Sequence, residues 1–210
     1  MQNFSRRAFT FGAPLALAGC AGGNVSMGVG DARAIYGQLS GERYPVPAID
    51  LSQIDPQFYR QDVAYASNEA PGTIIVDPGN HFLYHVTAAG RATRYGVGVG
   101  KQGFGWSGTA RIARKSEWPE WFPPVEMQAR DPRARKYANG MPGGVDNPLG
   151  ARAMYLYQGD HDTLYRIHGT IEPWSIGKSM SSGCIRLLNQ DVIDLYHNTN
   201  VGTKVIVLKA

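Results

Sequence analysis

The sequence is poor in cysteine, has no long apolar run and carries no strong excess of either charge. Its 2 cysteines among 210 residues exclude a disulfide-rich scaffold. No apolar stretch reaches the roughly 20 residues that a membrane-spanning helix needs. The formal net charge of +4 falls to about +2 (4 − 2) without Arg6 and Arg7, which is too weak to favour nucleic-acid binding. Internal repeats, low-complexity tracts and blocks of like charge are also missing.

The first twenty residues have the pattern of an export signal. Arg6 and Arg7 precede a short, mildly apolar run and resemble a twin-arginine signal. Residues 17–20 (LAGC) resemble a lipobox, which makes Cys20 the lipidated N-terminus of the mature protein. Cleavage after Ala18 is the alternative and leaves Cys20 unmodified. We therefore expect a signal peptide at 1–19, a tether and lead-in at 20–70, a folded domain at 71–210, and a lipid-anchored protein on the periplasmic side of the cell envelope.

An exported protein tends to oxidise its structural thiols in pairs. If Cys20 carries a lipid, Cys184 has no disulfide partner within the chain. A thiol kept free in such a compartment indicates reactivity, although a small buried cysteine is the common alternative.

The chain from residue 73 onward has the texture of a β-rich domain. Short β-branched and aromatic runs alternate with turn residues, and residues 77–80 (DPGN) suit a type II turn. One helix is expected at 189–198 with Asn189 as its cap, and a helical turn near 54–59 docks on the domain. Residues 115–148 form a long irregular connection, which is either a lid or a loop fixed by its aromatic residues. The predicted strands, which indicate a mainly β sandwich or barrel, are 73–76, 81–86, 91–99, 109–113, 153–157, 163–167 and 203–208.

Three patterns suggest cofactor or metal sites that we do not expect. Residues 98–103 have dinucleotide-binding spacing, but no helix follows them to bind a pyrophosphate. His81 and His85 share a strand face without a carboxylate or cysteine nearby to complete a metal site. Residues 160–162 (DHD) suit a polar turn. The sequence therefore predicts neither a cofactor nor a metal.

His168 and Cys184 form the pair that favours catalysis. An imidazole next to a thiol accepts its proton and stabilises the thiolate as an ion pair. Gly183 allows a sharp turn that aims backbone amides at a developing oxyanion. No side chain is an obvious partner to orient His168, so the backbone carbonyl of Gly169 is the candidate. Arg186 would lie on the same side of an extended segment as Cys184, where it either grips a substrate carboxylate or forms a surface salt bridge.

Four motifs in order resemble the L,D-transpeptidase catalytic domain, or YkuD domain: residues 118–124 (WPEWFPP), 142–150 (PGGVDNPLG), 168–170 (HGT) and 181–186 (SSGCIR). The resemblance covers residues 73–208. It implies a β-sandwich of mixed sheets with one short helix after the nucleophile. It also implies that Cys184 forms a thioester with the third residue of a peptidoglycan stem tetrapeptide, releases D-alanine and passes the acyl group to an amine.

The resemblance assigns further roles by position. It implies that the Gly169 carbonyl orients His168, that Ser181 is the motif serine, and that Arg186 is the basic residue after the nucleophile; we expect both of these last two to bind substrate. Many members have histidine where this chain has Ser182, so the base is expected to be His168 alone. Residues 104–109 replace a family stretch that contains Thr-Pro.

Two other functions stay open. A hydrolase would pass the same thioester to water, as a carboxypeptidase or endopeptidase. A non-catalytic wall-binding lipoprotein would keep the fold without the activity. A protein that had lost its enzymatic activity should, however, have lost at least one residue of the motif, and all of them are present.

Overall fold

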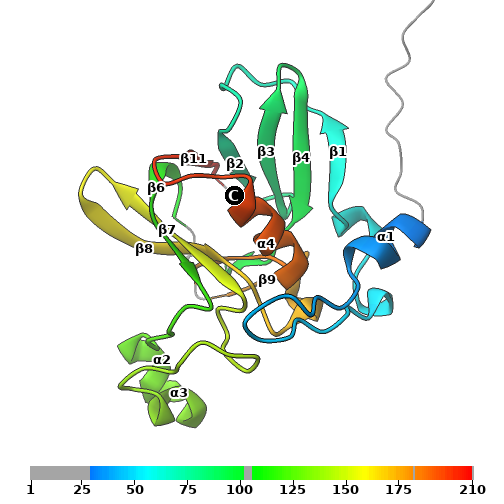
Figure 1. Cartoon of the computed structure of the whole chain (residues 1–210). Helices are drawn as coiled ribbons and strands as arrows, with labels where there is room; N and C mark the ends of the chain where they lie inside the picture. The colour runs from blue at the N-terminus through cyan, green and yellow to red at the C-terminus, as the bar shows by residue number, and fades with distance from the viewer. Residues whose placement is uncertain (1–28, 102–105, 182, 210) are drawn as a thin grey trace, which may run out of the picture.

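The computed structural model describes residues 29–101, 106–181 and 183–209 (Figure 1). A nine-stranded sheet has the order β1-β4-β3-β2-β11-β6-β7-β8-β10, and β5 pairs with β9 in a second, two-stranded sheet. The expectations for Arg6, Arg7, Cys20 and Ser182 concern residues outside these ranges and stay predictions. The strands are β1 (Gln61–Ala64), β2 (Ile74–Asp77), β3 (Phe82–Ala88), β4 (Arg91–Gly96), β5 (Val99–Gly100), β6 (Gly108–Glu117), β7 (Arg152–Gln158), β8 (His161–His168), β9 (Ser179–Ser181), β10 (Ile185–Arg186) and β11 (Lys204–Val207).

The mainly β architecture predicted from the sequence is confirmed. The seven predicted runs correspond to β2, β3, β4, β6, β7, β8 and β11. The sheet is mixed, because β11 runs parallel to β2 and β10 runs parallel to β8 while the other neighbouring pairs are antiparallel. The strands that we missed, β1, β5, β9 and β10, have at most four residues each and offer little periodicity to read.

One hydrophobic core joins the two halves of the large sheet. Helix α4 (Asn189–His197) lies between the β1–β4 half and the β6–β8 half in Figure 1. Leu83 and Tyr95 come from the first half, Met154 and Ile167 from the second, and Leu195 from the helix, and all are buried in the same cluster. Burial of each such side chain stabilises the fold by about 1.5–3 kcal/mol. The helix is therefore the centre of the core.

The lead-in segment packs on the domain from residue 29 onward. It contains α1 (Val29–Ile35) and the 3-10 helices η1 (Leu51–Gln53) and η2 (Pro56–Phe58). The last of these confirms the helical turn expected near 54–59, and the side chain of Asp55 caps it through the Gln57 amide. Tyr36 and Tyr59 are buried with Leu188 in a second apolar cluster. Residues 29–60 are thus part of the packed structure.

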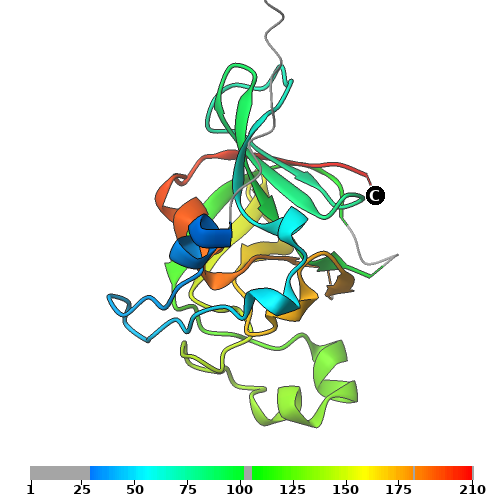
Figure 2. The ribbon, with the colours of Figure 1, turned by 90° about the vertical axis from the view of Figure 1, so that its right-hand side faces the viewer.

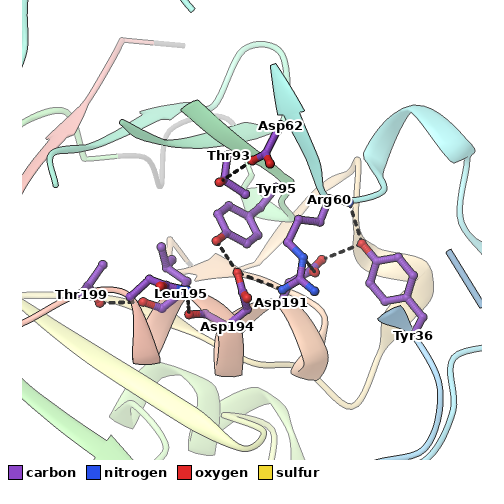
Figure 3. A network of polar contacts seen from close by, with 10 residues as sticks. Tyr36, Arg60, Asp62, Thr93, Tyr95, Asp191, Asp194, Leu195 and Thr199 are labelled. Carbon is purple, nitrogen blue, oxygen red and sulfur yellow. Dashed lines mark hydrogen bonds and ion pairs between the residues drawn. The ribbon is translucent and has the colours of Figure 1, made fainter. Parts of the chain in front are cut away.

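A polar network ties this segment to α4 (Figure 3). The Tyr36 hydroxyl donates to Asp191 Oδ2 at 3.1 Å and accepts from the Arg60 backbone N–H at 2.7 Å. Arg60 Nη1 lies 2.9 Å from Asp194 Oδ2, which also accepts from the Tyr95 hydroxyl at 2.6 Å. Burial raises the pKa of Asp191 to about 7, while the nearby charge of Arg60 opposes the rise. Asp191 therefore has a structural role beyond the first-turn acid of a helix.

The long connection between β6 and β7 is more ordered than the sequence indicated. It contains α2 (Val125–Arg130) and α3 (Pro132–Lys136), which lie at the bottom of Figure 2. The Asn147 side chain holds the loop by donating to the carbonyls of Pro119, Met141 and Pro142. Our expectation of a wholly irregular loop was wrong, because these two helices are too short to show a clear periodicity.

Two local interpretations also need correction. In the turn after β2, the positive φ falls on His81 (59°) and not on Gly79, so the turn is not type II. Asp77 instead holds the turn by accepting from the Asn80 amide. Helix α4 begins at Asn189, but its N-cap is Leu188 with no side-chain bond. In the described ranges, no helix is both long and apolar enough to cross a membrane.

Candidate active site

The loop that carries Cys184 lies between β9 and β10. Gly183 has a φ of 125°, a backbone conformation that favours glycine and permits the sharp turn expected here. The Ser181 hydroxyl donates to the Cys184 carbonyl at 2.7 Å and accepts from the Gly183 amide at 3.2 Å. Ser181 is buried, so its described bonds stabilise the nucleophile loop from inside. Because the Gly183 amide is engaged, its use for an oxyanion requires the long bond to Ser181 to open.

His168 is the last residue of β8 and is buried. Its Nδ1 lies 2.6 Å from the Gly169 carbonyl oxygen. A carbonyl only accepts, so this contact assigns the proton to Nδ1 and leaves Nε2 with its lone pair. The ring is thereby oriented with its basic nitrogen directed away from Gly169.

Strand pairing brings the two halves of the site together. In the parallel pair of β8 and β10, Ile185 lies opposite Ile167 and Arg186 lies opposite His168. Cys184 consequently lies directly before β10, the strand that neighbours His168. Cys184 is partly exposed and free of any disulfide. The contacts of the described residues do not include a hydrogen bond between Cys184 and His168. The two residues are neighbours, but the thiol is not hydrogen-bonded to the imidazole in this structure.

The surroundings keep both groups uncharged at neutral pH. Burial, together with the positive charge of Arg186, lowers the pKa of His168 to about 4, although its bond to Gly169 acts in the other direction. Burial raises the pKa of the Cys184 thiol, against the lowering effects of the Arg166 backbone bond and of the Arg166 and Arg186 charges. A neutral imidazole is available as a base. A resting ion pair, which the sequence suggested, is not favoured.

Arg186 has a protein partner in this structure. Its Nη1 donates to Glu172 Oε2 at 2.8 Å, which is the salt bridge that we considered as the alternative to substrate binding. The Glu172 carboxylate is 43% exposed and so can exchange for a substrate carboxylate without unburying a charge. The salt bridge therefore leaves substrate binding by Arg186 open.

Asn189 is a site residue that sequence reasoning misassigned. Its Oδ1 accepts from the Ala151 amide at 2.9 Å, and its Nδ2 donates to the Thr170 carbonyl at 3.2 Å. A Cβ on Gly150 or Gly169 would lie 2.2 Å from this same oxygen. Asn189 thus locks the turn after His168 against the start of β7. The glycines at positions 150 and 169 were the sequence signal that a side chain packs closely there. Helix capping, however, was a simpler explanation for an asparagine at position 189.

A cavity of about 530 Å³ borders the nucleophile loop. Its lining includes Gly183, Ile185, Tyr165 and Trp106. A peptide segment fits such a volume.

The aromatic residues of the long connection do not act as one group. Trp118 is buried, where it packs on Tyr44 and donates to Glu42, while Phe122 is 61% exposed. Trp118 therefore fixes the loop onto the domain, which was the alternative to a binding wall.

The patterns that suggested cofactor or metal sites have structural roles in the described ranges. Gly98 exchanges two backbone bonds with Arg186, and Val99–Gly100 forms β5. His81 contacts Ser179 Oγ at 3.0 Å, and His85 is buried in β3. Of residues 160–162, only Asp160 lies in the turn, because β8 already begins at His161. Among the residues that the structure describes, no group of three or more His, Cys, Asp or Glu side chains is arranged to hold a metal ion.

Comparisons with known proteins place this chain in a family. Residues 71–207 match the family described as the L,D-transpeptidase catalytic domain, YkuD. The probable L,D-transpeptidase YbiS of Escherichia coli K12 is 36% identical over 114 residues, which cover 52% of this chain and 35% of that protein. The probable L,D-transpeptidase ErfK/SrfK of the same organism is 33% identical over 141 residues, or 64% and 43% of the two chains. The chain thus spans less than half the length of these curated relatives.

Solved structures share the fold. One from Brucella melitensis, described as a probable carnitine operon oxidoreductase caia, is 52% identical, covers 76% of this chain and 99% of that chain, and has a TM-score of 0.51. The Ldtfm-avibactam carbamoyl enzyme is 18% identical, covers 68% and 50% of the two chains, and has a TM-score of 0.52. Because the family match covers more than half of the sequence and includes both His168 and Cys184, the chain belongs to the L,D-transpeptidase catalytic domain (YkuD) family.

Proposed function

We propose that the protein is a peptidoglycan L,D-transpeptidase that uses Cys184 as its nucleophile and His168 as its only histidine base. The observation that carries this proposal is that Cys184 directly precedes β10, the strand that pairs with β8 beside His168, with the Gly169 carbonyl 2.6 Å from His168 Nδ1. A base oriented in this way commonly contributes about 10²–10⁴-fold to the rate.

The first half-reaction forms a thioester. His168 Nε2 takes the proton of the Cys184 thiol as the sulfur attacks the carbonyl carbon of the third residue of the donor tetrapeptide. The carbonyl oxygen becomes an oxyanion, for which the Cys184 amide and, after its bond to Ser181 opens, the Gly183 amide are the candidate donors. The C–N bond to the terminal D-alanine then breaks, and the departing amine takes the proton from His168.

The second half-reaction restores the thiol. The amine of a neighbouring stem attacks the thioester carbonyl and gives its proton to His168. The C–S bond breaks, an amide forms, and the proton returns from His168 to the Cys184 sulfur. Arg186 binds a substrate carboxylate in exchange for Glu172. Ser181, which we expected to bind substrate, holds the nucleophile loop through its bonds to Cys184 and Gly183. No cofactor takes part.

The cellular setting is proposed from the first twenty residues. A twin-arginine signal exports the chain, and Cys20 carries the lipid that anchors it on the periplasmic side of the cell envelope. The tether and lead-in expected at 20–70 includes helix α1, which begins at Val29.

The test is incubation with tetrapeptide muropeptides followed by mass spectrometry. Dimers that lack one D-alanine indicate transfer, while shortened monomers indicate a carboxypeptidase. We expect Cys184→Ala to abolish the product and His168→Gln to reduce it by at least about 100-fold. His161→Gln is the matched control, because His161 is exposed at the opposite end of the same strand. Equal product from wild type and Cys184→Ala would refute both enzyme functions and leave a wall-binding protein.

A further inference from the structure

A row of cationic and aromatic side chains, to which the proposed mechanism gives no role, crosses the sheet and ends at the nucleophile. In the β6–β7 pair, Arg114 lies opposite Tyr155, and in the β7–β8 pair, Tyr155 lies opposite Arg166. Cys184 directly precedes the β8–β10 pairs, and continuing their register by one position brings it level with Arg166. Paired residues point to the same face of a sheet, so the row shares one face with His168, two residues after Arg166.

This face is the one turned away from the core. Its neighbours in sequence, Leu156 and Ile167, are fully buried in the main apolar cluster on the other face with α4. Alternation along each strand therefore directs Arg114, Tyr155 and Arg166 away from that cluster.

The two guanidinium groups share one aromatic ring. The Arg114 Cζ lies 3.4 Å from the Tyr155 ring centroid, and the Arg166 Cζ lies 4.6 Å from it. Arg166 is neutralised by Asp162, which accepts from both of its terminal nitrogens at 2.7 and 2.9 Å. Arg114 is exposed, and no ion pair of the described ranges includes it. The row thus presents one unneutralised guanidinium that an aromatic ring holds in a fixed orientation.

We propose that Arg114, held over Tyr155, binds a carboxylate of the peptide substrate close to the carbonyl that Cys184 attacks. This inference rests on the proposed function. A planar guanidinium pairs with a carboxylate through two parallel hydrogen bonds. Stacking on Tyr155 reduces the conformational freedom that Arg114 loses on binding.

The distance between Arg114 and the nucleophile limits which substrate carboxylates Arg114 can bind. Arg114 lies on β6 and Cys184 lies directly before β10, so the strand order β6-β7-β8-β10 separates their backbones by three strand spacings, about 14 Å. An extended peptide advances about 3.3–3.6 Å per residue, so the carboxylate lies within about four residues of the reacting carbonyl. Two sources satisfy this limit: the C-terminal carboxylate of the donor, or a carboxylate of the acceptor stem.

Steady-state kinetics with paired peptides tests the proposal. Donor and acceptor are each supplied with a free carboxylate and as the matching amide, to wild type, Arg114→Gln and Arg114→Lys. We expect Arg114→Gln to raise the KM of one free-carboxylate peptide by about 10- to 100-fold and to leave the KM of its amide unchanged. The peptide affected identifies the source, and Arg114→Lys should recover part of the loss. Arg111→Gln is the matched control, because Arg111 is on the same strand and contacts the Gly159 carbonyl and Asp160.

Two outcomes would overturn the subsite. One is an unchanged KM in Arg114→Gln for every peptide, and the other is an equal increase for the acid and amide forms. If wild type has no turnover, the proposed function fails, and the same peptides are titrated calorimetrically into Cys184→Ala with and without Arg114→Gln. A preference for the free carboxylate that depends on Arg114 still supports the subsite, while its absence overturns it.

Discussion

Glu42 lies well before the segment that matches the family, yet we expect Glu42→Ala to destabilise the whole domain. Its carboxylate accepts from Arg152 Nη2 at 2.7 Å, from Arg152 Nη1 at 2.8 Å and from Trp118 Nε1 at 3.1 Å. The Arg152 side chain is only 3% exposed, and its Nε has no partner in the described ranges. The substitution therefore leaves a buried guanidinium with no carboxylate.

The expected loss is about 3–5 kcal/mol, the usual cost of removing one partner from a buried ion pair. Chemical unfolding in urea, followed by circular dichroism, measures it. With a slope near 2 kcal/mol per molar urea, the midpoint falls by about 1.5–2.5 M. The Glu42→Ala/Arg152→Met double variant should recover most of the stability, because the buried charge is gone.

Glu69→Ala is the matched control. Glu69 pairs with Lys204 at 2.7 Å, but both side chains are far more exposed, at 31% and 48%. Exposed pairs contribute about 0–1 kcal/mol. If Glu42→Ala costs no more than this control, residues 29–60 are not part of the cooperative unit and the reasoning is refuted.

Three further predictions follow from named contacts. Because the pKa of Asp191 is raised to about 7, the contribution of this group to the free energy of unfolding is greatest near pH 4 and is lost as pH rises through 7. Between pH 4.5 and pH 8, Asp191→Asn should therefore become at least about 1 kcal/mol more stable relative to wild type, as measured by urea unfolding. An equal change in stability with pH for the two proteins would contradict this. Asn189→Ala leaves the Ala151 amide unpaired and should lower the free energy of unfolding by about 2–4 kcal/mol in the same assay. A loss below 0.5 kcal/mol, about the effect of a typical surface change, would argue against a stabilising role of Asn189. The rate of Cys184 alkylation by iodoacetamide should rise about tenfold per pH unit from pH 6 to 8, because neither its thiol nor His168 is charged at neutral pH. Fast, pH-independent alkylation at pH 5–7 would instead show that the resting enzyme holds a thiolate–imidazolium ion pair.

Local sequence patterns were informative wherever a few neighbouring residues decide the structure. β-Branched runs placed β2 and β11, and glycine at position 183 indicated the sharp turn that its φ of 125° shows. The apolar spacing of 192, 195 and 196 placed α4. These features depend on propensity and on side-chain periodicity, which the order of residues contains directly.

The sequence by itself thus determined seven of the strands and helix α4, and it supplied the prediction of which residues react. Tertiary structure alone decided that β10 pairs with β8, which sets Cys184 beside the strand of His168. It also decided that Glu42 meets Arg152 from 110 positions away. Such contacts depend on how distant segments close over a shared core, and the loop-closure entropy and burial that select them leave no signature in the residues nearby.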